Sequence, residues 1–336
     1  MDSTSETLWI NELAHLGAHI ESGTIRHFGD AAGELRAARD GKVIAALSHL
    51  TMLEFAGEDA EAFLQGQLSC DVKALAQGAV TLGSYNTAKG RMLASFFLLR
   101  AGERFLMLLS ADIAATIQKR LTMFILRAKV KITQLQDTLV LLGLSGAAQN
   151  VELENLTPTQ AANMQPFQLA DGRKLLLIAE TNALEIWSAL TTQFKPIGAP
   201  AWQWLDILHG IPFITSATQD QLVPQMTNLE LIGGVSFKKG CYPGQEIVAR
   251  TQYLGKVKRR MFRAHLEVEA KPGDALYSDD LGDQASGLVI SSQASPEGGY
   301  ELLVVTQMGS RESSTVRLKS SQGPALRFEP LPYTID

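Results

Sequence analysis

Cysteine is scarce in this chain of 336 residues, with only Cys70 and Cys241 present. Two cysteines are too few for a disulfide framework, and they exclude a four-cysteine metal site. They suit a reducing compartment, so we expect a cytoplasmic protein without a resident metal. At about 150 residues per domain, the length predicts two or three domains.

Long apolar runs and a secretory leader are also lacking. The most apolar stretch, residues 93–109, is interrupted by Arg100, Glu103 and Arg104, which is too much charge for a membrane span. The first 17 residues have no basic segment followed by an apolar run, so we expect no secretory signal. A content of 46% hydrophobic and 19% charged residues is typical of a globular protein, and no membrane partner is expected.

Positive charge is in slight deficit, with 30 Lys and Arg against 35 Asp and Glu, for a net charge of −5. This argues against a protein that is basic over its whole surface. However, residues 238–263 hold eight bases and one acid, so this segment carries +7 and the remainder −12. Such a local field attracts an anionic ligand or partner. A solvated basic linker between domains explains the charge equally well.

Short strands and helices alternate through the first 260 residues. Residues 31–39 and 113–127 have helical spacing of apolar side chains, and two apolar runs on either side of residues 101–103 predict a β-hairpin. After about residue 260, short β-rich runs are separated by Gly, Pro and Asp turns. The pattern predicts an α+β fold with mainly antiparallel sheets. The expected division is a tail and helix over 1–40, an α+β region over 41–260, and a small β-barrel or sandwich over 261–336.

Cys241 is a candidate reactive thiol. It follows Lys238 and Lys239, and Pro243 with the residues after it resembles a helix start. Nearby ammonium groups and a helix N-terminus both stabilise a thiolate. The alternative is a small buried core cysteine, which is the commoner fate of a lone cysteine. Cys70 follows an apolar helical pattern and is predicted to belong to the core.

Several blocks of the chain resemble one protein family. Residues 238–246 resemble the K-G-C-Y-x-G-Q-E signature of the YgfZ family of folate-binding proteins, relatives of the glycine-cleavage aminomethyltransferase (T-protein). Residues 57–72, 86–92 and 223–229 resemble further blocks of that family, in the same order. The residues of the signature segment are Lys238, Lys239, Gly240, Cys241, Tyr242, Gly244, Gln245 and Glu246.

The resemblance implies a GcvT-like, three-part ring in which residues 41–260 form two subdomains and the C-terminal barrel forms the third part. A central opening would hold tetrahydrofolate or a derivative. The implied function is that of a folate-binding accessory protein that supports iron–sulfur cluster assembly or repair and, through it, tRNA modification. The implied partners are iron–sulfur enzymes or assembly proteins, and Cys241 is implied to be a functional thiol.

A pterin is flat and aromatic and needs a stacking surface, whereas the glutamate tail of folate is anionic and needs bases. Trp202 lies in the block where the family places a ligand-contacting tryptophan, and Trp204 is the alternative if the register is shifted. Plain core packing is the competing role for Trp202. The other candidate ligand contacts are Lys239, Arg250, Lys89 and Tyr85.

The chain departs from the family pattern at three places. Leu208 stands where relatives commonly have Glu, and Leu50 where a second tryptophan is expected. Asp206 would replace that carboxylate only if it faces the pocket. Residues 91–97, after the Lys89-Gly90 turn, contain no carboxylate, although aminomethyltransferases carry one there. The T-protein reaction is therefore not expected, because no group would orient the folate amine and the incoming aminomethyl group.

Three other functions remain open at this stage. A folate-dependent C1-transfer enzyme would turn over a methylamine donor. A direct tRNA binder would use the basic segment 238–263 and lose affinity steeply with salt. A scaffold that has lost its ligand would act through protein contacts alone, and Leu208 and Leu50 favour this alternative.

Overall fold

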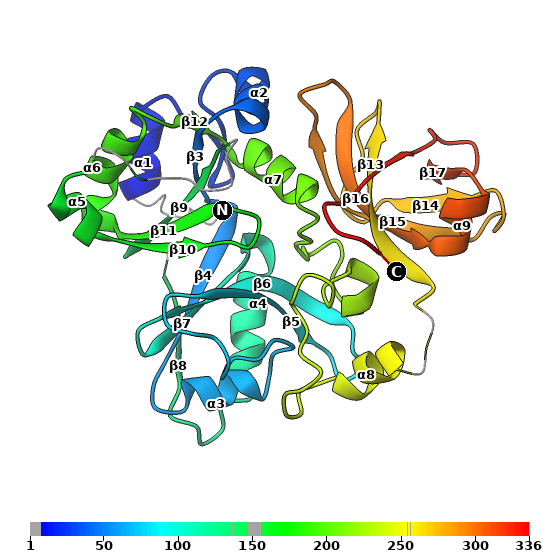
Figure 1. The fold of residues 1–336 in the computed structure, drawn as a ribbon, viewed down its shortest axis with the longest axis horizontal. Coiled ribbons are helices and arrows are strands. Elements are labelled where there is room, and N and C mark those ends of the chain that lie inside the picture. The colour runs from blue at the N-terminus through cyan, green and yellow to red at the C-terminus, as the bar shows by residue number, and fades with distance from the viewer. Residues whose placement is uncertain are drawn as a thin grey trace.

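The computed structural model describes residues 8–135, 138–146, 153, 156–253, 255 and 257–335. It contains three bodies arranged around helix α7 (Ala199–Leu208), as Figure 1 shows. Helix α7 joins the first and third bodies, because it contacts strands of both. The predicted α+β class and three-part arrangement are confirmed.

The first body is a five-stranded sheet in the order β10-β11-β9-β3-β12, antiparallel except for the β12–β3 pair. Helices α1 and α6 cover one face, and α2 and α7 lie on the other side. Its elements are α1 (Leu8–His15), β1 (His19–Glu21), β2 (Thr24–His27), α2 (Ala31–Asp40), β3 (Val43–Ala46), β9 (Leu139–Ser145), α5 (Pro158–Ala162), β10 (Met164–Gln168), β11 (Lys174–Ala179), α6 (Glu180–Leu190) and β12 (Lys195–Ile197).

The N-terminal segment holds more structure than the expected tail and single helix. Helix α1 and the β1–β2 hairpin precede α2, which spans the predicted helix. Trp9 and Leu13 of α1 are buried against the first sheet. The Trp9 ring packs edge-on against that of Trp187 of α6, with 5.6 Å between the ring centroids. Three of the eight residues of α1, Trp9, Ile10 and Leu13, are buried, so the helix docks through one narrow apolar stripe.

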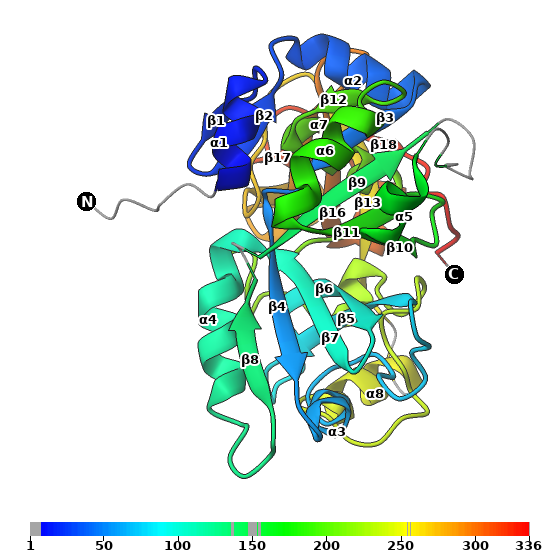
Figure 2. The ribbon, with the colours of Figure 1, turned by 90° about the vertical axis from the view of Figure 1, so that its left-hand side faces the viewer.

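The second body is a five-stranded antiparallel sheet in the order β5-β6-β7-β4-β8. Figure 2 shows the first two bodies stacked, with α4 packed along the lower sheet. Its elements are β4 (Leu50–Ala56), α3 (Ala60–Gln65), β5 (Val80–Asn86), β6 (Met92–Ala101), β7 (Arg104–Ser110), α4 (Ala111–Thr122) and β8 (Lys131–Gln134). The predicted hairpin over 92–109 is confirmed as β6–β7.

Strands β6 and β7 are apolar on both faces because both faces are covered. Phe97 and Leu99 of β6 enter the core shared with α7 and the first body, whereas Phe96 and Leu98 enter the core under α4. Successive strand side chains point to opposite faces, so a doubly covered strand is apolar at most positions. Within the described residues, no helix is long and apolar enough to cross a membrane.

The third body is a curled six-stranded sheet in the order β17-β14-β15-β16-β13-β18, which matches the predicted C-terminal β domain. A connecting segment with the short 3-10 helix η1 (Pro224–Thr227) and α8 (Gln245–Tyr253) links it to the second body. Its elements are β13 (Arg259–Leu266), β14 (Ala275–Ser278), β15 (Ala285–Ala294), β16 (Tyr300–Gln307), α9 (Met308–Ser313), β17 (Val316–Leu318) and β18 (Arg327–Glu329).

Candidate functional site

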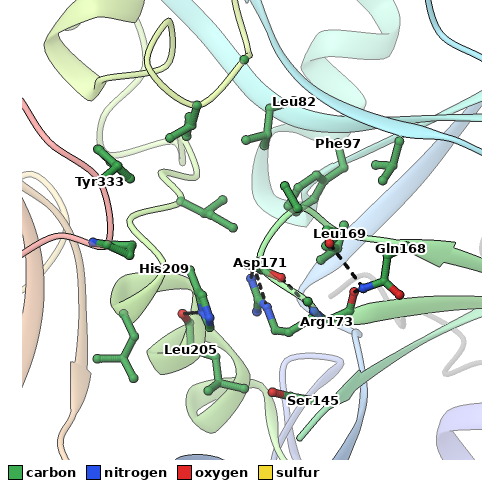
Figure 3. A pocket seen from close by; sticks show the side chains of 18 of the residues that line it. Leu82, Phe97, Ser145, Gln168, Leu169, Asp171, Arg173, Leu205, His209 and Tyr333 are labelled. Atoms are coloured by element: carbon green, nitrogen blue, oxygen red, sulfur yellow. Dashed lines mark hydrogen bonds and ion pairs between the residues drawn. The ribbon is translucent and has the colours of Figure 1, made fainter. Parts of the chain in front are cut away.

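A cavity of about 1050 Å³ lies between the first two bodies, the end of α7 and the C-terminal segment that follows the third body, and Figure 3 shows it from close by. Its wall combines β5 and β6 of the second body, the end of β9, the β10–β11 turn, the C-terminal end of α7 and the C-terminal segment of the chain. Both apolar and polar side chains line it. The lining includes Arg39, Leu82, Phe97, Asp171, Arg173, Leu208, His209 and Tyr333.

The β10–β11 turn places a buried arginine in this wall. Gly172 adopts a φ of +91°, and the turn closes with the Leu169 amide donating to the Arg173 carbonyl at 2.9 Å. The Asp171 carboxylate accepts from the Arg173 amide at 3.0 Å and from the guanidinium Nη2 at 2.8 Å. The sequence Asp-Gly-Arg therefore folds back on itself, and the Arg173 side chain is only 2% exposed.

Helix α7 supplies the second counter-ion of Arg173. Asp206 Oδ1 lies 2.8 Å from Nη2, and the guanidinium carbon lies 4.7 Å from the centre of the Trp202 ring. Burial raises the pKa of Asp206 to about 6, although Arg173 opposes that rise. The pKa of Asp171 moves the other way: burial would raise it, but the guanidinium holds it below its ordinary value.

His209 and Tyr333 complete the polar lining on the α7 side. His209 Nδ1 lies 2.7 Å from the Leu205 carbonyl, and since a carbonyl only accepts, Nδ1 carries the proton. Burial and the nearby Arg173 lower the pKa of His209, so its ring is neutral. The Tyr333 hydroxyl donates to the Gly210 carbonyl at 3.0 Å, and burial raises the pKa of Tyr333 to about 12.

The signature turn, defined here as residues 238–246, lies outside this cavity. No residue of it lines the cavity, and Cys241 is exposed four residues before α8 begins at Gln245. Gly244 has a φ of +79° and packs on the neighbouring turn so closely that a Cβ there would lie 2.4 Å from the Thr87 carbonyl and 2.6 Å from the Gly90 Cα. Two blocks that are distant in sequence thus meet backbone to backbone.

Lys238 and Lys239 differ in their surroundings although they are adjacent. Lys238 is exposed, whereas Lys239 is buried and its ammonium donates to the Leu68 and Cys70 carbonyls at 2.6 and 2.9 Å. Burial lowers the pKa of Lys239 to about 8. Its ammonium therefore fixes the loop before β5. Cys70 is buried as predicted, and burial raises the pKa of its thiol to about 12.

The block at 223–229 forms the joint between the connecting segment and the third body. The Gln225 side chain donates to the Val248 carbonyl of α8 at 2.6 Å, and Asn228, at a φ of +57°, donates to the Met261 carbonyl of β13 at 2.8 Å. Both residues are fully buried. These polar side chains therefore hold backbone segments together.

Comparison with known proteins supports the resemblance. The GCVT N-terminal domain model matches residues 24–184. The tRNA-modifying protein YgfZ of Edwardsiella ictaluri is 33% identical over 302 residues, which is 84% of this chain and 90% of that protein. The protein of the same name from Photorhabdus laumondii is 32% identical over 296 residues, covering 83% and 89%. The chain belongs to the YgfZ family.

The fold of this YgfZ family member is also found in a solved structure of another protein. The glycine cleavage system aminomethyltransferase T of Bartonella henselae aligns with a TM-score of 0.75 over 97% of both chains, at 18% sequence identity. The predicted GcvT-like fold is therefore confirmed. Among the described residues, no group of three or more His, Cys, Asp or Glu side chains could hold a metal ion.

The five predicted ligand contacts do not line the cavity of this YgfZ family member. Trp202 is 2% exposed, and its ring lies behind Arg173 and against Gly143. Trp204 and Tyr85 are equally buried in the cores. Lys89 and Arg250 are exposed on the turn after β5 and on α8, and Lys239 is engaged with the loop carbonyls. Their roles as ligand contacts stay predictions.

The three residues discussed as departures from the family pattern, or as a replacement for one, lie in three different environments. Leu208 lines the cavity, so the position where the resemblance leads us to expect Glu is apolar here. Asp206 points to Arg173 and does not line the cavity, and Leu50 packs against the core shared by the first two bodies.

Apart from Leu208, the residues that line the cavity carried no motif in the sequence. The pair Asp171-Gly172 is typical of a turn, which it forms, but nothing in the sequence indicates that the arginine after it is buried. Phe97, His209 and Tyr333 are single residues from three distant segments. The one usable signal was the proximity of Leu208 and His209 to the tryptophan block on α7.

Proposed function

We propose that this chain binds a tetrahydrofolate-type ligand in the central cavity. We further propose that it acts as an accessory protein in tRNA modification by supporting iron–sulfur enzymes. The observation that carries the proposal is this central cavity, whose volume of about 1050 Å³ suits a ligand of this size. The relatives, which are named tRNA-modifying proteins, add the connection to tRNA modification.

The lining fits the parts of a folate. Phe97 and Tyr333 offer aromatic surface for a flat ring. Arg173 and His209 offer polar atoms beside it. Arg39 lines the cavity on its exposed side, where it pairs with Asp40 and Glu297. Exposed ion pairs contribute little, so Arg39 can exchange them for a ligand carboxylate at small cost.

The thiol of Cys241 is assigned to the protein partner, because it is exposed and lies outside the cavity. One cysteine cannot hold an iron–sulfur cluster within a single chain, since such clusters are commonly held by four thiolates. We therefore propose that Cys241 acts as a transient ligand or reactive group towards an iron–sulfur protein.

Anaerobic calorimetry with tetrahydrofolate tests the ligand half. The wild-type chain is expected to show saturable binding, and Leu208→Trp to abolish it because the indole occupies cavity space. The matched control is Leu184→Trp on α6, an exposed leucine that does not line the cavity, which should bind as the wild type does. Absence of saturation by the wild type at millimolar tetrahydrofolate would refute this half.

Complementation tests the cellular half. In cells that lack this protein, thiolated tRNA nucleosides are quantified by mass spectrometry after wild type, Cys241→Ala or Cys70→Ala is supplied. Wild type and Cys70→Ala are expected to restore the thiolated nucleosides, and Cys241→Ala is not. Full restoration by Cys241→Ala would remove the thiol from the proposal.

A further inference from the structure

One wall of the cavity contains a buried charged group with unused hydrogen-bonding capacity. Arg173 lines the cavity, and its Nε and Nη2 are engaged by Asp171 and Asp206. Its Nη1 has no hydrogen-bond partner among the described residues. An unpaired buried donor is costly, and the cost is larger for a charged group. The guanidinium is thus held firmly by two carboxylates while one of its nitrogens lacks an acceptor.

His209, which neighbours Arg173 in the cavity wall, has an unused hydrogen-bond acceptor. The Nδ1 proton of His209 is used by the Leu205 carbonyl, so Nε2 of the neutral ring is left with a free lone pair. His209 also lines the cavity, and Figure 3 shows its ring directed towards Asp171 and Arg173. Leu205 and Leu208 make the adjoining surface apolar. Arg173 and His209 are therefore neighbours in this apolar wall, the first with an unpartnered donor and the second with an unused acceptor.

The carboxylates do not themselves provide a free binding edge. Both oxygens of Asp171 are engaged by the backbone amide and guanidinium of Arg173, and Asp206 does not line the cavity. They position Arg173. The matching ligand edge is one that carries an acceptor next to an N–H donor, as a cyclic amide does.

We propose that Arg173 and His209 recognise the cyclic amide edge of the ligand's pterin ring, with Nη1 donating to the 4-oxo oxygen and Nε2 accepting from N3–H. This inference rests on the proposed folate-type ligand and specifies which end of it meets α7. The pterin lies against Arg173 and His209, and the glutamate tail extends towards Arg39. Recognition by this pair replaces the carboxylate that is absent at Leu208.

The 4-amino analogue of the ligand tests the assignment on the unaltered protein. Tetrahydroaminopterin differs from tetrahydrofolate only at the 4-position, where it has an amino donor, and its N3 is an acceptor. Donor would face donor and acceptor would face acceptor. Anaerobic calorimetry is expected to show at least about 10-fold tighter binding of tetrahydrofolate, from the loss of a charge-assisted hydrogen bond.

Variants test which residues produce that preference. His209→Phe keeps a ring of similar size but lacks the acceptor, and Arg173→Gln removes the charged donor. Both are expected to reduce the preference towards equal affinity, whereas Arg39→Gln, which alters the exposed side of the cavity, should leave it unchanged. A merely structural defect would weaken both ligands alike. If Arg173→Gln does not fold, the ratio of the two ligand affinities in the wild type and in His209→Phe still tests the proposal.

The possible outcomes separate the two proposals. If the wild type binds neither ligand, the proposed function fails and this inference fails with it. If the wild type binds both ligands equally, the folate site stands and the recognition by Arg173 and His209 is refuted. A preference that survives unchanged in folded His209→Phe and Arg173→Gln would refute the assignment to these two residues.

Discussion

The central cavity and the signature turn differ in how they are built. The signature turn is a continuous segment held by backbone contacts, above all Gly244 against Gly90, and it leaves Cys241 exposed. The cavity is assembled from side chains of the first two bodies, α7 and the C-terminal segment, and its polar centre is a buried ion cluster on the β10–β11 turn and α7. The signature turn exposes a thiol to solvent, whereas the wall of the cavity contains a buried cluster of charged side chains.

The residues that carry the family resemblance and the residues that line the cavity are therefore largely different sets. The residues that carry the family resemblance are glycines and polar groups that fix backbone geometry, such as Gly244, Gln225 and Asn228. The residues that would meet a ligand are not part of those blocks. In this chain, substitutions in the cavity lining, at positions such as Leu208, leave the contacts of the signature turn untouched.

The largest expected effect contrasts the two cysteines. At pH 7.5, iodoacetamide should alkylate Cys241 at least about 1000-fold faster than Cys70, because Cys70 is 1% exposed and burial raises its pKa to about 12. Mass spectrometry of timed samples gives both rates, with Cys241→Ser as the control for assignment. Equal and slow labelling of the two would show that the signature turn does not present a usable thiol.

A second contrast lies within the signature turn. Gly244→Ala should lower the free energy of unfolding by at least about 3 kcal/mol, since a Cβ would collide with the Thr87 carbonyl and Gly90, and φ is positive. Gly240→Ala is the matched control, because nothing lies within 4 Å of its Cβ position, and should cost less than about 1 kcal/mol. Urea unfolding measures both, and similar losses would refute the backbone docking of the two turns.

The smallest effect concerns the ion cluster of the cavity. Asp206 has a folded pKa raised to about 6 from 3.8, so its contribution to stability is full below pH 3.8 and is lost as pH rises through 6. Relative to Asp206→Asn, the wild type should lose up to about 3 kcal/mol of unfolding free energy between pH 4 and pH 7.

Asp171→Asn sharpens this test, because the pKa of Asp171 is shifted in the opposite direction to that of Asp206. The lowered pKa of Asp171 gives stability that is present above its unfolded pKa and is lost on acidification. In urea unfolding, the wild type should therefore lose stability relative to Asp206→Asn as pH rises from 4 to 7, and relative to Asp171→Asn as pH falls below 3.8. Parallel pH profiles would show that Arg173 is not held asymmetrically by its two carboxylates.

The elements with strong local patterns were predictable. The β6–β7 hairpin, α4 and the β-rich third body follow from apolar periodicity and turn residues, and the resemblance predicted the three-part fold. Helix α1 was missed, although its buried residues Trp9, Ile10 and Leu13 stand at helical spacing, because the apolar stripe covers little more than one turn. Cys70 as a core residue and Cys241 close before a helix also follow from local patterns.

The cavity lining was not predictable, because it depends on which distant segments meet. Trp202 was the reasonable choice for a ligand surface, yet the packing of α7 buries its ring beneath Arg173. Lys239 is similar: its charge suggested an anion site, but its ammonium meets two backbone carbonyls of the loop before β5. Residue type alone does not determine direction or partner.

By itself, the sequence determined the class of the fold, the order of its elements and the special backbone positions, because these depend on neighbours along the chain. Only the tertiary structure decided that Arg173 is buried between two carboxylates beside a cavity and that Cys241 stands apart from it. Both outcomes depend on desolvation and on contacts between segments more than thirty residues apart, and no local pattern encodes these.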